Sequence, residues 1–469
     1  MKSQLGYASA LFLGAGSLLV LAPDVVAQTQ PAAQPAAPVA PAAKPADESQ
    51  LGEFVVTGTS EEHIPKIAVL PSLSPDLEDV IVRSVVRRDL EISGMFKVIP
   101  DQEAPTGLYG FNDAVDVKAW QAKGAEAIVK VAARRSETPD VIDVLGIAYF
   151  PSAGSAPVYE VKITVPKADA RRTAHRITDD LLGALTGRPG GFSSHFTFAG
   201  AWGRNRRAFS VDADGYGLAA RSDVKATALA PTWSDTGDLF YVQSANFSPY
   251  RLVKLGPKAT EAVRVDVPFQ RSLYGVAFDK EHKRMALSVS EPEGSAIYVG
   301  DADGKNMKRQ SNTEVAIHPV FSPSGKLAWI GGTAEQGGQR VYLDGKAISP
   351  SGFAAYAPTF CDTEDGIFLV YAVTVGDHQD LVMSGEKGQG VQRLTQNQGS
   401  NSYPACSPDG RLLAFFSTRK GEPGLYVMSL KRWTTMKVLS TVGEALRWDS
   451  LPDAKEKLPS TKASKAPAK

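Results

Sequence analysis

Residues 404–410 read PACSPDG, and two related phrases occur earlier in the chain, PTWSDTG at 231–237 and PVFSPSG at 319–325. Each copy is followed by a short apolar run of the kind that forms a strand. Weaker copies lie between and after these three. The third position of the phrase recurs about every 40 to 45 residues, a period typical of repeat arrays. This position falls at Trp233, Phe278, Phe321, Phe360, Cys406 and Trp448.

Each period holds about four short strands separated by turn signals. Pro408-Asp409-Gly410 is such a signal, because proline fixes φ and glycine accepts the left-handed conformation. Four-stranded units repeated radially make a β-propeller. The sequence therefore predicts an all-β six-bladed propeller over residues 191–450. The strand around Trp448 is expected to complete the first blade, which removes a free sheet edge. The recurring aromatic residues are expected to pack between blades, with a ligand cage as the alternative.

Residues 53–190 have a different pattern, in which strand-like runs alternate with helical ones. Strands are expected at 66–70, 96–99 and 127–131, with a hairpin at 142–149 and 158–165. Helices are expected after Asp76 and over 171–185, and glycines at 94 and 187 are placed to end them. This pattern predicts a small α/β N-terminal domain. Residues 187–191 are expected to act as a hinge before the propeller.

The two ends of the chain are expected to lie outside these domains. Residues 1–27 combine Lys2, an apolar stretch and small residues before Gln28, which is typical of a cleaved secretory signal; an uncleaved anchor helix is the alternative. Residues 28–52 are rich in proline and alanine and are expected to form an extended tether. Residues 451–469 are rich in Lys, Pro, Ala and Ser and are expected to be a disordered tail.

Composition excludes several classes of partner and chemistry. The chain of 469 residues has 51 Lys+Arg and 51 Asp+Glu, so no net charge favours nucleic acid or anionic lipid. The sequence has no phosphate-binding glycine loop, no nucleophile elbow and no histidine pair at metal spacing. No catalytic residue, cofactor or metal is therefore expected.

A few residues remain open to more than one interpretation. His318 is expected to be a polar residue in the propeller channel, with a metal or catalytic role as the alternative. Asp212-Ala213-Asp214-Gly215 and residues 301–304 are expected to be hairpin turns rather than calcium loops. Cys361 lies one residue past the recurring position that Cys406 occupies. Since adjacent strand residues face opposite ways, two buried thiols without a disulfide are expected.

The arrangement and several local motifs resemble the TolB family of the Tol–Pal system. Outside the repeats, residues 67–71 (IAVLP), 89–96 (DLEISGMF), 174–179 (AHRITD) and 185–192 (LTGRPGGF) are similar to motifs of that family. The resemblance extends over about residues 53–451. It implies a monomeric, non-enzymatic periplasmic adaptor that supports outer-membrane integrity and cell division and does not bind nucleic acid.

The resemblance also implies two docking sites. A Pal-like peptidoglycan-associated lipoprotein would bind at one mouth of the propeller channel. By matching position, that face would include Arg271, Ser272, Tyr274, Gly275, Ile317, His318, Tyr356 and Tyr403. A TolA-like inner-membrane protein would bind the N-terminal strand, which corresponds here to Glu53, Phe54, Val55, Val56 and Thr57. This strand is set back behind the tether, and Ser272 and Ile317 stand where the family often has polar contacts.

Two other functions remain as alternatives. One is a propeller enzyme acting on polysaccharide through groups such as His318 and Arg271. The other is a small-molecule sensor with its ligand in the channel.

Overall fold

The computed structural model describes residues 47–52, 63–72, 76–105, 109–332, 338–419, 421–452, 458 and 460–463. The expected signal segment, most of the tether and the strand expected at residues 53–57 lie outside the described residues. Among the residues described, no helix is both long and apolar enough to span a membrane.

The N-terminal domain is a six-stranded mixed sheet with the order β2-β1-β3-β4-β5-β30. β1 pairs in parallel with β2 and β3, and the other pairs are antiparallel. The strands are β1 (Lys66–Val69), β2 (Lys97–Val98), β3 (Ala127–Arg135), β4 (Val141–Tyr149), β5 (Tyr159–Pro166) and β30 (Ser460–Ala463). The short 3₁₀ helices are η2 (Asp101–Glu103), η3 (Pro151–Ala153) and η4 (Lys167–Asp169). The predicted α/β domain is thus present.

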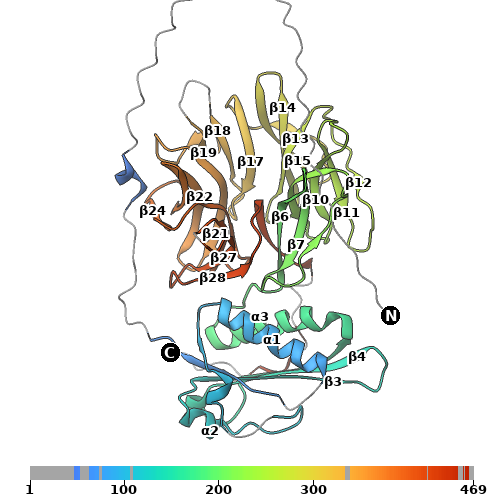
Figure 1. Cartoon of the computed structure of the whole chain (residues 1–469), viewed down its shortest axis with the longest axis vertical. Coiled ribbons are helices and arrows are strands. Elements are labelled where there is room, and N and C mark those ends of the chain that lie inside the picture. Colours follow the sequence, from blue (N-terminus) through green and yellow to red (C-terminus); the bar gives the residue numbers. More distant parts are fainter. Residues whose placement is uncertain are drawn as a thin grey trace, which may run out of the picture. The chain divides into compact units, whose positions relative to one another are not determined.

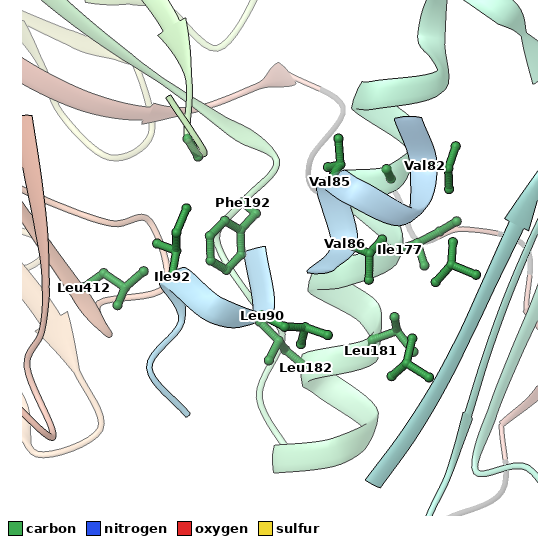
Figure 2. Packing of buried hydrophobic residues seen from close by; sticks show 14 of the residues in the cluster. Val82, Val85, Val86, Leu90, Ile92, Ile177, Leu181, Leu182, Phe192 and Leu412 are labelled. Carbon is green, nitrogen blue, oxygen red and sulfur yellow. The ribbon is translucent and has the colours of Figure 1, made fainter. Parts of the chain in front are cut away.

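Two long helices, α1 (Leu77–Ile92) and α3 (Ala170–Thr186), pack side by side on one face of this sheet (Figure 1). The short α2 (Val117–Ala122) packs on the opposite face, where Trp120 is buried with Ile128. Apolar residues of α1 recur every three or four positions, so one stripe faces α3 and the sheet. Figure 2 shows this core continuing through Ile92 and Phe192 to Leu412 of the propeller. The two domains therefore share one apolar core.

The propeller consists of six four-stranded sheets (Figure 1). The closing blade comprises β29 (Glu444–Ser450), β6 (Ser194–Trp202), β7 (Asn205–Asp212) and β8 (Ala219–Ala220). The next two are β9 (Thr227–Trp233), β10 (Leu239–Ser244), β11 (Arg251–Leu255) and β12 (Val263–Arg264), then β13 (Leu273–Phe278), β14 (Arg284–Glu291), β15 (Gly294–Asp301) and β16 (Lys308–Arg309). The fourth is β17 (Val315–Phe321), β18 (Leu327–Gly332), β19 (Arg340–Leu343) and β20 (Lys346–Ala347). The last two are β21 (Ala355–Thr363), β22 (Gly366–Val375), β23 (His378–Gly385) and β24 (Gln392–Arg393), then β25 (Asn401–Cys406), β26 (Leu412–Ser417), β27 (Gly424–Ser429) and β28 (Thr435–Leu439).

The ring closes as the sequence predicts. β29 pairs antiparallel with β6, and Trp448 lies opposite Phe196. Their rings are 4.4 Å apart, and the Trp448 indole N–H donates to Ser194 Oγ at 2.7 Å. The last strand of the ring is therefore fixed both by packing and by a buried hydrogen bond.

The structure differs from the expected tether and tail at two places. The end of the tether forms η1 (Glu48–Leu51), in which Leu51 is fully buried against the fifth blade and Glu48 binds Arg393 at 2.9 Å. Within the tail expected to be disordered, β30 pairs with β5. The physical reason is local in both cases, because a single apolar side chain can dock in a preformed pocket and an open sheet edge can accept another strand.

The cysteine expectation was wrong, because Cys361 and Cys406 form a disulfide with a Cα–Cα distance of 5.3 Å. They lie on β21 and β25, the innermost strands of adjacent blades. Neighbouring blades meet through opposite faces of their sheets. A displacement of one residue therefore brings the two side chains together, where the sequence reasoning expected them to point apart.

The segment expected to be a hinge is held on both sides. Gly187 ends α3 with φ 83°. Beyond it, Arg411 of the last blade donates to the carbonyls of Arg188 and Pro189, and the Asp179 carboxylate accepts from the N–H groups of Phe192 and Ser193. The connection is therefore part of the packed junction.

Candidate functional site

The innermost strand of every blade carries a bulge at the same place. Strand pairing shifts register there in all six blades. In five blades the bulge residue has a positive φ of 46 to 53°, a conformation that non-glycine residues adopt at a cost. These residues are Ala230, His318, Ala357, Tyr403 and Ala445; in the sixth strand, β13, the register shifts at Tyr274, next to Gly275. The bulge turns each of these residues toward the centre of the ring.

The five bulge residues with positive φ and Gly275 surround a cavity of about 30 Å³ in the centre of the propeller, room for about one water molecule. Arg447 of β29 also lines this cavity and donates to the Pro319 carbonyl of β17 at 3.1 Å. The channel is therefore narrowest where these residues meet.

Three polar side chains meet at this narrowing, those of His318, Tyr403 and Arg447. The His318 and Tyr403 rings lie 6.3 Å apart, edge to face. Enclosure among the blades, together with the charge of Arg447, lowers the pKa of His318 to about 4, so His318 is neutral at pH 7. Enclosure also raises the pKa of the Tyr403 hydroxyl. The narrowing thus presents a neutral imidazole and a neutral phenol beside one guanidinium.

The structure brings only part of the predicted face to the channel. Gly275, His318 and Tyr403 line the central cavity. Ile317 and Tyr356 pack instead in the apolar layers between blades, because they precede the bulge residue and face the other way. Arg271 and Ser272 directly precede β13 and Tyr274 is its second residue, so these three residues lie just before Gly275 in the chain.

The outer residues lie in the segment that enters β13. Arg271 is exposed, and its backbone carbonyl accepts from Arg251 at 3.0 Å. Ser272 Oγ accepts the Tyr250 N–H at 3.2 Å. Tyr274 is 38% exposed, which leaves its ring available to a partner.

A second cluster of charged residues joins the two domains. Arg171 of α3 donates from Nε to Asp212 Oδ2 at 3.1 Å and from Nη2 to Asp214 Oδ2 at 2.6 Å. On the same helix, His175 Nδ1 lies 2.8 Å from Asp89 of α1, and its Nε2 lies 3.9 Å from Asp212. The expected turn at residues 212–215 is present, with Gly215 N–H donating to the Asp212 carbonyl. The carboxylates of this turn, Asp212 and Asp214, bind Arg171 of the N-terminal domain.

The charged residues of this junction have strongly shifted pKa values. Burial alone would lower the pKa of His175, but Asp89 and Asp212 outweigh it and raise the pKa to about 10. Burial would raise the pKa of Asp212, but the neighbouring His175 and His195 hold that pKa well below its usual range. The cluster therefore contains protonated histidine and ionised aspartate at neutral pH. Asp89, His175 and Asp214 also present atoms close enough to hold a cation, but Arg171 already occupies Asp214.

Sequence reasoning missed the roles of Arg171, His175 and Arg447. His175 lies within the AHRITD motif, but only the fold shows that Asp89 and Asp212 lie beside it. Arg447 directly precedes Trp448, so its position one residue before the recurring aromatic could have indicated the channel.

Comparison with known proteins gives a match to the family model described as "TolB amino-terminal domain" at residues 53–144. The curated Tol-Pal system protein TolB of Dinoroseobacter shibae is 29% identical over 191 residues, which cover 39% of this chain and 42% of that protein. The Tol-Pal system protein TolB of Anaeromyxobacter dehalogenans is 25% identical over 243 residues, which cover 50% of this chain and 54% of that protein. The chain thus spans about half the length of the curated relatives it matches.

Among solved structures, TolB from Acinetobacter baumannii superposes with a TM-score of 0.67 at 22% sequence identity. The superposition covers 82% of this chain and 97% of that one. This likeness concerns the fold, in which a mixed α/β domain precedes a six-bladed propeller. In its amino-terminal domain and over part of its sequence, the chain is thus similar to the TolB family.

Proposed function

We propose that this protein is a non-enzymatic periplasmic adaptor of a Tol–Pal-like envelope system. It docks a Pal-like outer-membrane lipoprotein on the channel mouth that Tyr274, His318 and Tyr403 surround, and it supports outer-membrane integrity and cell division. The observation that carries the proposal is the ring of six bulges at this mouth. Bulges often lie where a protein directs side chains at a binding site, and positive-φ residues persist only where the structure holds them in place.

The mouth has properties suited to a protein partner. Its centre has neutral aromatic groups, and Tyr274 adds an exposed ring at the edge. Tyrosine and arginine are enriched among residues that dominate binding energy at interfaces, and Arg271 supplies an exposed guanidinium beside Tyr274. A rigid face of this kind loses little conformational entropy when it binds.

The proposal also includes a TolA-like inner-membrane partner at Glu53, Phe54, Val55, Val56 and Thr57. This part rests on the sequence, because those residues lie outside the described ones. In the sequence they come after Gly52, the residue that ends η1, and η1 itself docks on the fifth blade through Leu51.

Binding of a purified Pal-like lipoprotein domain to the immobilised chain tests the docking mouth. Tyr274→Ala is expected to weaken binding about tenfold or more, the loss expected for an interface tyrosine. Val263→Ala is the matched control, since Val263 is 56% exposed on the outermost strand β12. Equal binding by Tyr274→Ala and the parent chain would contradict the proposed face. Failure of the parent chain to bind any Pal-like domain would contradict the proposed partner.

A further inference from the structure

Arg447 divides the propeller channel into two compartments. Its strand β29 and strand β17 belong to blades that lie opposite each other in the six-membered ring. The Arg447 guanidinium reaches across to the Pro319 carbonyl on that opposite blade. Among the described residues, Arg447 alone lines both the central cavity and a larger chamber beyond it.

The chamber has a volume of about 390 Å³ and lies at the ends of the innermost strands, away from the proposed docking mouth. The residues of the repeated phrase form its walls. They include the recurring aromatics, each of which also belongs to an apolar cluster of the core: Trp233, Phe278, Phe321, Phe360 and Trp448. A chamber with apolar walls and a few polar groups is the usual form of a small-molecule site.

Most charges around the chamber are already paired. Asp279 binds Arg284 at 2.9 Å, and Asp362 binds Lys280 at 3.0 Å. These two carboxylates gain little from a further cation, because a charged partner already offsets each one. The Asp235 side chain is 57% exposed, so water screens its charge.

Arg447 and Asp449 differ from these residues, because their hydrogen bonds go to neutral groups. Arg447 donates to a backbone carbonyl. Asp449 Oδ2 accepts from the Trp233 N–H at 3.2 Å and from the Thr232 hydroxyl at 3.4 Å. Both residues belong to β29 and are two positions apart, so their side chains share a face with roughly 7 Å between Cα atoms. The inner end of the chamber therefore presents one guanidinium and one carboxylate, whose charges attract each other while their hydrogen bonds go to neutral groups.

We propose that this chamber binds a small zwitterion of the amino-acid class. Its carboxylate binds Arg447, its ammonium binds Asp449, and its side chain lies against the aromatic wall. Arg447 has five N–H donors arranged to hold a carboxylate. A ligand with only one of the two charges leaves the other protein charge unpaired, which explains why a zwitterion is the complementary class.

The electrostatics of the two residues agree with this assignment. Burial lowers the pKa of Arg447 and raises the pKa of Asp449, although the two charges attract each other, so each charged form remains disfavoured. A zwitterion brings the opposite charge to each group and stabilises both charged forms.

Titration of the full chain with L-leucine tests the proposal, followed by calorimetry and by tryptophan fluorescence, since Trp233 and Trp448 line the chamber. N-acetyl-L-leucine lacks the ammonium group and L-leucinamide lacks the carboxylate. Each is expected to bind about tenfold or more weakly than L-leucine, the loss that accompanies one charge-assisted hydrogen bond. Arg447→Gln and Asp449→Asn are expected to cause losses of the same size.

Lys280→Gln is the matched control, because it removes a positive charge from the same chamber at a residue already paired with Asp362. It is expected to bind L-leucine as the parent chain does. The two analogues test the same contacts on the unaltered chain, so the conclusion does not depend on the folding of a variant. Absence of L-leucine binding at up to about 10 mM, or equal binding of L-leucine and L-leucinamide, would overturn the proposal.

This inference is independent of the docking proposal. The chamber and the docking mouth lie on opposite sides of Arg447, so Tyr274→Ala is expected to leave L-leucine binding unchanged. Loss of Pal-like docking with intact ligand binding would contradict only the docking proposal, and the reverse result only the ligand site.

Discussion

The buried pair of His175 and Asp89 allows the strength of the junction to be predicted. His175 is 4% exposed and Asp89 is fully buried, so water screens their interaction poorly. Burial alone would lower the pKa of His175, but Asp89 and Asp212 outweigh it and raise that pKa to about 10, while burial raises the pKa of Asp89 above its usual range. Removal of one member of a buried pair typically costs about 3–5 kcal/mol. His175→Gln, which keeps similar size without the charge, is therefore expected to lower the free energy of unfolding by about 3 kcal/mol or more at pH 6.

The cost should depend on pH in a defined direction. The folded-state pKa of His175 is raised, so its stabilising contribution is complete below the unfolded value of about 6.5. That contribution is lost as the pH rises through about 10. Urea unfolding of the parent chain and of His175→Gln at several pH values between about 6 and 10 measures the difference, which should shrink steadily toward the alkaline end.

A surface histidine provides the control. His63 lies 2.7 Å from Glu126, but its side chain is 72% exposed and that of Glu126 is 44% exposed. His63→Gln should therefore cost less than about 1 kcal/mol at any of these pH values. If His175→Gln costs the same at pH 6 and pH 10, the charge interaction is not what holds the junction, and the assignment of a protonated His175 is refuted.

Three further changes test other parts of the ring. Trp448→Ala removes the ring-closing indole and should cost about 3–5 kcal/mol of unfolding free energy, measured as a large drop in melting temperature; an unchanged melting temperature would show that closure does not depend on this residue. Cys361→Ser removes the link to Cys406 and should cost about 2–4 kcal/mol, and dithiothreitol should then destabilise the parent chain but not the variant; equal sensitivity of both to the reductant would contradict the disulfide. Gly410→Ala would place a Cβ 1.9 Å from a backbone oxygen at a φ of 72°, whereas Gly421→Ala at a φ of 86° meets no atom within 4 Å. A left-handed non-glycine residue alone costs roughly 1–2 kcal/mol of unfolding free energy, so Gly410→Ala should cost clearly more than Gly421→Ala when both are measured by urea unfolding. Equal costs would contradict the close contact at Gly410.

Periodic features were predictable from the sequence because they depend on local residues. Each copy of the repeated phrase, such as the one that ends at Gly410, marks the end of an innermost strand. The spacing of the copies predicts the number of blades. Trp448 could be assigned to ring closure because it repeats the same phrase without a blade after it. The helices and strands of the N-terminal domain follow from their apolar periodicity in the same way.

Features that depend on which way a side chain points were not predictable. Tyr356 was expected at the docking face. The bulge instead turns Ala357 toward the channel, and Tyr356, the residue before it, packs between blades. The disulfide of Cys361 and Cys406 depends on how neighbouring sheets face each other, which the spacing of the repeats does not specify. The contact of Leu51 with the fifth blade joins segments that are far apart in the sequence.

The strand β30 has a mechanical consequence. The chain passes from the α/β domain to the propeller after Gly187, and it passes back after Pro452 to reach β5. Two bodies joined by one covalent connection can swivel about it, whereas two connections restrict them to rotation about the line between the crossing points. Force that pulls the domains apart would therefore be shared between the backbone near Gly187 and the hydrogen bonds of β30. Removal of the residues after Pro452 would leave the packed junction and the connection at Gly187 to carry the whole of such a force.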